Sequence, residues 1–162
     1  MIKRALLFIR LPIVLLVLWT VMRFLMGTAF GVPYAPRGNA VFSVLGLTAI
    51  SSIYYGALSK RIGHFSWLGT IVIGFLLAEI GQVLIFSATA LSYGIGRETY
   101  FTHWDALNVP EGTVVPIAEA MTRRSVAFLV APILPIVCAI IGRILSGLMP
   151  GAKAAAAAAA AE

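Results

Sequence analysis

Four stretches of nearly uninterrupted apolar residues divide the chain, and each is long enough to cross a membrane as a helix. About 20 apolar residues are needed, because a helix rises about 1.5 Å per residue through a hydrocarbon core about 30 Å thick. Backbone groups in lipid must be satisfied within each segment, and the alternating pattern of barrel strands is missing, so helices are predicted. The stretches cover residues 5–26, 40–58, 65–93 and 125–149.

This pattern predicts an all-α fold: an integral membrane bundle of four transmembrane helices with one ordered extramembrane loop, residues 94–124. Residues 1–150 form a single four-helix transmembrane domain in this prediction. Residues 151–162 are an alanine-rich tail of low complexity, either a natural helical end or unassigned residues written as alanine. Pro132 and Pro135 each remove a backbone donor, so the fourth helix is predicted to be kinked.

Small residues in the second and third stretches predict close approach of helix backbones within the chain. The second stretch has Ser52 and Gly56 four residues apart. The third has Gly74, Ala78 and Gly81. Such residues are common in membrane helices, and ordinary packing within the chain is the expected use.

Composition favours a membrane protein and argues against a nucleic-acid partner. Apolar residues make up 60% of the 162 residues and charged residues only 11%, against about 45–50% and about 25% in soluble domains. The 12 Lys and Arg exceed the 6 Asp and Glu. They are scattered between the apolar stretches, which fits membrane topology better than a phosphate-binding face.

Positive charge is also uneven between the predicted loops. Cytoplasmic loops are enriched in Lys and Arg, so we expect both termini in the cytoplasm of a bacterium and the protein in its inner membrane. If the four stretches alternate across the membrane, seven basic residues fall on the side of the termini and four on the other. The seven are Lys3, Arg4, Arg10, Lys60, Arg61, Arg143 and Lys153, and the four are Arg37, Arg97, Arg123 and Arg124.

One acidic residue, Glu79, lies within the third apolar stretch. Counted from Phe65 it lies about 21 Å deep, a little past the middle of a bilayer. Gln82 follows on the same helix face, and Arg23, counted from Leu6, lies at nearly the same depth. A charge at the membrane centre costs about 2.5–3.5 kcal/mol. The sequence therefore predicts an intramembrane polar group of Arg23, Glu79 and Gln82.

Two other roles for Glu79 stay open. It can carry a proton or a cation, although no second relay group accompanies it. Alternatively it can bind a lipid headgroup, a pigment, a quinone or a basic residue of a partner subunit.

The predicted outer loop concentrates aromatic and charged side chains. Aromatic rings near the end of a span usually lie at the membrane interface, and the alternative is a surface that binds a partner. Glu98, His103 and Asp105 lack the spacing of a metal motif, so no metal site is predicted. The candidate partner-contact residues are Arg97, Tyr100, Phe101, His103, Trp104 and Asp105.

No motif in the sequence indicates catalysis. Ser66 is two residues from His64, a spacing at which side chains on a helix point apart, and no G-x-S-x-G elbow is present. The single Cys138 allows neither an internal disulfide nor a thiolate cluster. Both histidines fall in predicted loops, which argues against a haem held between two transmembrane histidines. We expect no cofactor bound by this chain alone, with lipid or pigment contact left open.

We therefore expect not an enzyme but a non-catalytic accessory or scaffold subunit of a larger membrane complex, such as a respiratory or photosynthetic electron-transport complex. Its partners would be other integral membrane subunits and the lipid bilayer. The alternative is a small oligomeric proton-coupled transporter that uses Glu79. A third class is a membrane enzyme that acts on lipid through His103 and Asp105.

Overall fold

The computed structural model describes residues 1–32 and 43–148, and these residues form helices and loops with no strand among them. The all-α prediction is confirmed. In chain order the elements are α1 (Ile2–Phe8), α2 (Arg10–Thr28), α3 (Val44–Arg61), α4 (Trp67–Gly94), the short 3-10 helix η2 (Asp105–Leu107), α5 (Ile117–Val130) and α6 (Ile133–Leu148).

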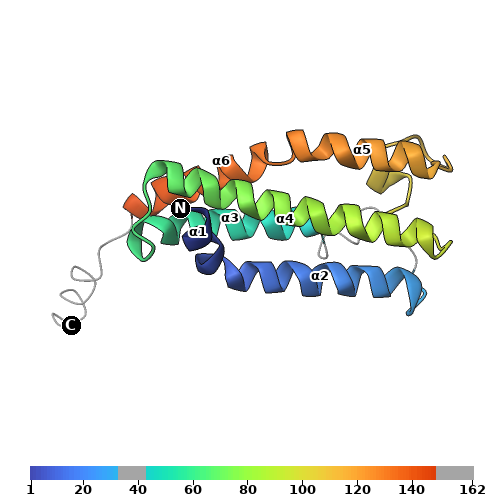
Figure 1. Cartoon of the computed structure of the whole chain (residues 1–162), viewed down its shortest axis with the longest axis horizontal. Coiled ribbons are helices and arrows are strands. Elements are labelled where there is room, and N and C mark those ends of the chain that lie inside the picture. The colour runs from blue at the N-terminus through green and yellow to red at the C-terminus, as the bar shows by residue number, and fades with distance from the viewer. Residues whose placement is uncertain (33–42, 149–162) are drawn as a thin grey trace.

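The long helices run side by side along the long axis of the molecule (Figure 1). One end, here called the basal end, holds α1, the loop between α3 and α4, and the end of α6. The opposite, distal end holds the ends of α2 and α4, the loop that follows α4, and the start of α5. The positions of candidate residues near helix ends are given below as basal or distal.

Three helical segments are long and apolar enough to cross a membrane: Arg10–Thr28, Trp67–Gly94 and Ile117–Gly147. The predicted span at 40–58 is not among these candidates from the described residues, so three of the four predicted spans are supported and the second is not. Residues 40–42 lie outside the described residues, and the remainder belong to α3. The hydropathy of α3 is lowered by Lys60 and Arg61 in its last turn and by a set of buried polar residues, Thr48, Ser51, Ser52 and Ser59. The protein covers these polar groups, because α3 packs between α4 and α6.

Glycines bring α3 and α6 into backbone contact. A Cβ atom on Gly56 would meet the backbone of Ala139 in α6, and a Cβ on Gly142 would meet the carbonyl group of Ile53 in α3. A Cβ on Gly74 of α4 would lie 2.7 Å from the carbonyl oxygen of Pro135. The predicted close packing of helices at small residues is confirmed for Gly56 and Gly74.

The apolar core lies between the α1–α2 pair, α3 and α4. Ile9, Leu16, Ile73 and Leu77 are fully buried in it. The buried residues of α2 form a narrow stripe at positions 12, 16 and 20. Other α2 side chains, among them Leu11, Leu15 and Leu18, are exposed, so this helix has the apolar outer surface that lipid contact requires.

The first apolar stretch is not one helix, because it is interrupted at Ile9 between α1 and α2. Pro12 has no N–H to donate to the carbonyl of Phe8, which favours a break there. Arg4 then holds α1 against the α3–α4 loop, since its Nη2 donates to the carbonyl of Gly63 at 2.6 Å. The ring of Phe8 packs on Phe65, with their centroids 5.2 Å apart.

The fourth apolar stretch is also interrupted, between the end of α5 at Val130 and the start of α6 at Ile133. Pro132 cannot donate to the carbonyl of Phe128, so the regular hydrogen-bond series stops. The break is visible in Figure 1 as an irregular turn between α5 and α6. The predicted kink is confirmed.

Arginines fasten α6 to the basal end. Arg143 Nη1 donates to the carbonyl of Phe65 at 2.8 Å and to Thr70 Oγ1 at 2.9 Å. Arg61 Nη2 donates to the carbonyl of Ser146 at 2.8 Å. These charged donors satisfy carbonyl groups at helix ends that have no partner in the helix itself.

Ser66 begins α4, where its Oγ accepts a hydrogen bond from the N–H of Gly69 at 3.2 Å. We expect Ser66→Ala to lower the free energy of unfolding by about 1 kcal/mol, because an N-terminal backbone donor loses its partner. Ser66→Asp should keep the parent stability, since its carboxylate also accepts from this N–H. Unfolding in dodecyl maltoside micelles titrated with SDS measures both. Equal stability of the alanine and aspartate variants would show that the cap contributes nothing.

Candidate functional site

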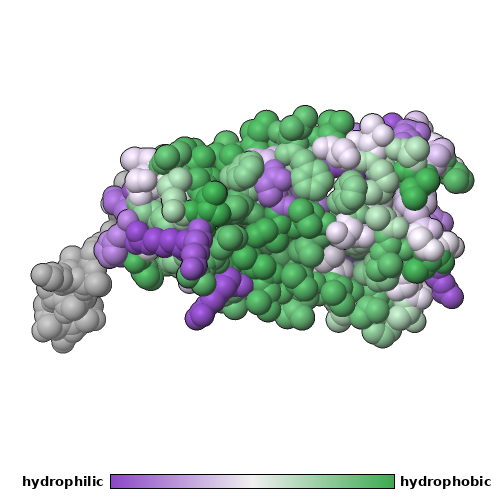
Figure 2. Space-filling view, viewed as in Figure 1, coloured by the Kyte–Doolittle hydropathy of each residue, from purple (hydrophilic) through white to green (hydrophobic). Residues whose placement is uncertain are grey.

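Glu79 lies on the outward-facing stripe of α4. Residues four apart share a helix face, and Phe75 and Val83, four residues before and after Glu79, have 44% and 52% of their surface exposed. Glu79 itself is partly exposed. Figure 2 shows hydrophilic atoms enclosed by apolar ones midway along the molecule. A carboxylate therefore interrupts a stripe whose neighbouring members are apolar and point away from the bundle.

The carboxylate of Glu79 has no protein partner in the part of the chain that the structure describes. The ion pair formed between described residues is that of Arg123 Nη2 and Glu119 Oε1, 2.8 Å apart on the surface of α5. Gln82, buried to 7% exposure, likewise makes no side-chain hydrogen bond with the described residues. The side chains of Glu79 and Gln82, midway along α4, are thus unsatisfied by the described residues.

The structure does not bring Arg23 to Glu79, and that part of the predicted polar group is wrong. The Arg23 guanidinium stacks over the rings of Tyr100 and Phe101, with 5.6 Å and 5.7 Å to the ring centroids. Arg23 lies only five residues before the end of α2 at Thr28, whereas Glu79 lies fifteen residues before the end of α4 at Gly94. Both helices end at the distal end, so the two side chains differ in depth by about 15 Å.

Arg124 fastens the loop after α4 to the bundle. Its Nη2 donates to the carbonyl of Phe101 at 2.9 Å, and its Nε donates to Thr89 Oγ1 in α4 at 3.2 Å. Arg23 stacks on the same loop from α2, and the hydroxyl of Tyr100 donates to the carbonyl of Val32 at 2.8 Å. The sequence assigned Arg124 only a place on the distal side. Its position seven residues after the start of α5 and directly before an apolar run was the available signal.

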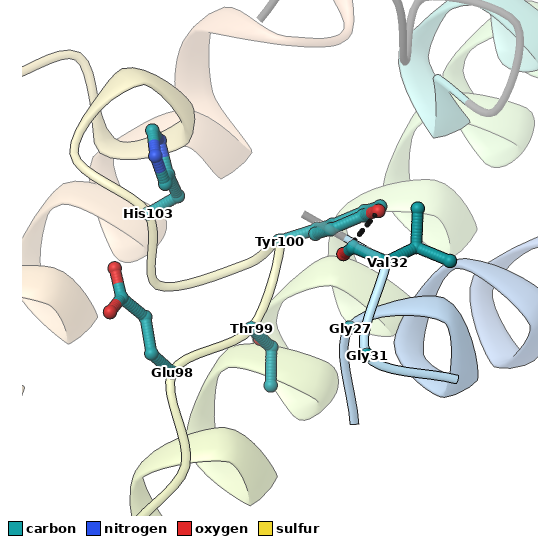
Figure 3. A pocket seen from close by; sticks show the side chains of 7 residues that line it. All are labelled: Gly27, Gly31, Val32, Glu98, Thr99, Tyr100 and His103. Carbon is teal, nitrogen blue, oxygen red and sulfur yellow. Dashed lines mark hydrogen bonds between the residues drawn. The ribbon is translucent and has the colours of Figure 1, made fainter. Parts of the chain in front are cut away.

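The candidate partner-contact residues divide into buried and exposed groups. Tyr100 and Phe101 are only 2% and 3% exposed, so they hold the loop in place and cannot contact a partner. In Figure 3 Tyr100 points toward Val32, while Glu98 and His103 lie on the opposite side of the loop. The exposed candidates are Arg97 and Asp105.

His103 and Trp104 are partly buried neighbours, with ring centroids 4.9 Å apart. His103 Nδ1 accepts a hydrogen bond from the backbone N–H of Asp105 at 3.3 Å, at the start of η2. This contact gives His103 a role in shaping the loop. Among the described residues, no three His, Cys, Asp or Glu side chains are grouped so as to hold a metal ion.

Two cavities lie at the distal end. The first, about 360 Å³, is the one drawn in Figure 3, between the end of α2 and the loop, and it includes Glu98, Tyr100 and His103. The second, about 460 Å³, is here called the distal cavity. It lies between the loop after α4 and the segment before α5, and Glu98 lines it as well.

Comparison with known proteins adds no guide to function. No protein-family model, curated protein or solved structure matches this chain. The geometry therefore carries the functional argument. It offers a carboxylate midway along α4 that has no partner in residues 1–32 and 43–148, and two cavities at the distal end.

Proposed function

We propose that this chain is a non-catalytic integral membrane subunit that assembles with another membrane protein through the outward stripe of α4. The observation that supports this function is Glu79, a carboxylate on an outward stripe between the apolar Phe75 and Val83, with no partner among the described residues. Facing lipid, it would cost about 2.5–3.5 kcal/mol on insertion scales. A polar group from a neighbouring helix would remove much of this cost, so the residue favours assembly.

The partner is a transmembrane helix with a lysine or arginine at mid-membrane depth. A cation complements the carboxylate, and the exposed side chains of Phe75 and Val83 supply the apolar contacts on either side of the pair. Polar contacts between membrane helices contribute about 0.6–2 kcal/mol each. That is enough to select one partner helix over a purely apolar one, because an apolar partner would leave Glu79 unsatisfied.

The charges at the two ends support an orientation for this subunit. The basal end carries Lys3, Arg4, Lys60 and Arg61, and the described acidic residues other than Glu79 belong to the distal loop and α5. Because basic loops stay in the cytoplasm, the basal end is placed in the cytoplasm and the distal end outside a bacterial inner membrane. Respiratory and photosynthetic electron-transport complexes are assemblies that such a subunit would serve.

Site-specific photo-cross-linking tests the proposal. With p-benzoylphenylalanine in place of Val83, we expect a cross-link in native membranes to one membrane protein, at a segment that contains a Lys or Arg. Glu79→Leu should abolish the cross-link, and Glu79→Gln should retain part of it because an amide still forms hydrogen bonds. The same probe at Leu18, 59% exposed on α2, should give no specific product. Ser87→Ala, on the same stripe, should leave the cross-link unchanged.

Three results would contradict the proposal: equal cross-linking from Val83 and Leu18, a product insensitive to Glu79→Leu, or a product made only of two copies of this chain. Misfolding is separable from lost assembly. Leucine at an outward position should leave the helix content and the unfolding temperature of the purified chain unchanged.

The break between α5 and α6 favours a second candidate, proton-coupled transport by a small oligomer with Glu79 as the coupling group. Broken transmembrane helices are a feature of secondary transporters. Under this function Glu79→Gln stops proton-driven uptake in proteoliposomes and leaves the oligomer intact. Under the proposed assembly function the same variant weakens the complex, and the parent shows no coupled flux.

A further inference from the structure

The distal cavity has the size of a small-molecule site and lies directly beyond the end of α4. Its volume of about 460 Å³ falls within the range of about 300–1,000 Å³ typical of ligand pockets. The Tyr93 hydroxyl donates to the carbonyl of Val115 at 2.7 Å, which joins its two walls. The walls are therefore held in place without a ligand, and the cavity lies at the distal end of α4, the longest unbroken helix among the candidate membrane spans.

Two side chains of opposite charge line this cavity, and neither pairs with another described residue. Arg97 and Glu98 are adjacent, exposed and part of its wall. Neither side chain forms an ion pair or a hydrogen bond with another described residue. Nearby, Arg123 and Glu119 neutralise each other at 2.8 Å. The cavity wall offers one cation and one anion to a ligand.

The other rim of the cavity is apolar. Val114 is 91% exposed, the highest value among the exposed large hydrophobic residues of the described chain. The half-buried ring of Trp104 also lines the cavity, and tryptophan is enriched where a membrane meets water. A ligand that covers this rim must carry an apolar part beside its charged part.

We propose that the distal cavity binds a phosphate and an ammonium carried on one group, and that this group is the headgroup of a zwitterionic phospholipid. Arg97 holds the phosphate, because a guanidinium donates two parallel hydrogen bonds to it. Glu98 holds the ammonium, and Val114 and Trp104 contact the glycerol and the first part of the acyl chains. Glu98 would repel an anionic headgroup. This inference does not depend on the role of Glu79.

Lipid titration of the purified full-length chain in dodecyl maltoside tests the inference. By native mass spectrometry, we expect one dioctanoyl phosphatidylethanolamine per chain, and at least tenfold weaker binding of dioctanoyl phosphatidylglycerol. Arg97→Gln and Glu98→Gln should each weaken the first lipid at least tenfold. Their matched controls, Arg123→Gln and Glu111→Gln, change the same charges outside the cavity and should bind like the parent.

Cavity-filling variants locate the site independently of charge. Thr113→Trp fills the distal cavity at an exposed position and should abolish binding, whereas Val32→Trp fills the first cavity and should leave it unchanged. Equal binding of both lipids, or unchanged binding after Arg97→Gln and Thr113→Trp, would overturn the inference. Free phosphoethanolamine that binds as tightly as the lipid would assign the cavity to a soluble ligand and overturn the lipid assignment.

Discussion

Gly142→Ala will force α3 and α6 apart and lower the free energy of unfolding by at least about 3 kcal/mol, the upper end of the usual cost of overpacking. The added methyl group falls on the carbonyl group of Ile53, and behind it lies the helix backbone rather than a side chain that can rotate away. Gly56→Ala should have a similar effect, because its methyl group meets the backbone of Ala139. SDS titration followed by circular dichroism measures both.

Gly94→Ala is the matched control, since a Cβ at this position meets open space. Its stability should equal that of the parent within about 0.5 kcal/mol. If Gly142→Ala is too unstable to purify, the fraction of monodisperse protein after gel filtration replaces the titration. A Gly142→Ala protein as stable as the control would contradict the backbone contact between α3 and α6.

Arg124→Leu will release the loop after α4 from the bundle. Leucine keeps the apolar bulk of the side chain, but the carbonyl of Phe101 and the hydroxyl of Thr89 lose a charged donor. Leaving such groups unsatisfied costs about 1–3 kcal/mol each. We expect amide protection in residues 97–104 to fall at least tenfold in hydrogen exchange, with a smaller loss in α3.

The adjacent Arg123→Leu provides the control. Arg123 is exposed and pairs with Glu119 one turn away, and such pairs contribute about 0.3–0.5 kcal/mol. Its exchange pattern should match that of the parent. If Arg124→Leu and Arg123→Leu leave residues 97–104 equally protected, the loop is held by other contacts.

The sequence predicts those features of the fold that depend on local composition. The run of apolar residues in α4 and the missing N–H of Pro132 act within one segment, and both appear where expected. The depth of Arg23 depends instead on where its helix begins. Counting Arg23 from Leu6 and Glu79 from Phe65 assumed that the two helices begin at the same level, but α2, with 19 residues, and α4, with 28, both end at the distal end (Figure 1).

Whether α3 faces lipid, and whether the aromatic residues of the distal loop are buried, depends on contacts with segments that are distant in the sequence. Residues 40–58 are apolar enough to suggest a span, but the buried serines of α3 are covered by other helices and not by lipid. Tyr100 and Phe101 are aromatic residues near a helix end, which suits a membrane interface as well as an interior. In the fold, Arg23 of α2 and Arg124 of α5 contact Tyr100 and Phe101, and both aromatic residues are buried.

The distal cavity was not predictable from spacing, because its walls come from two separate segments. Arg97 and Glu98 follow α4, and Val114 precedes α5. Neither segment carries a binding motif of its own. The hydrogen bond from Tyr93 to Val115 and the loop that Arg124 holds set their relative positions.

The packing of α3 has a consequence for the order in which the chain is built into a membrane. Synthesis delivers α3 before α4 and long before α6, yet those two helices cover its polar side. Because α3 is less apolar than the three candidate spans, it gains little free energy from entering lipid by itself. We therefore expect α3 to stay beside the insertion machinery or at the membrane surface until α4 and α6 have been made. In this order of events, α6 completes the cover that makes α3 part of the bundle.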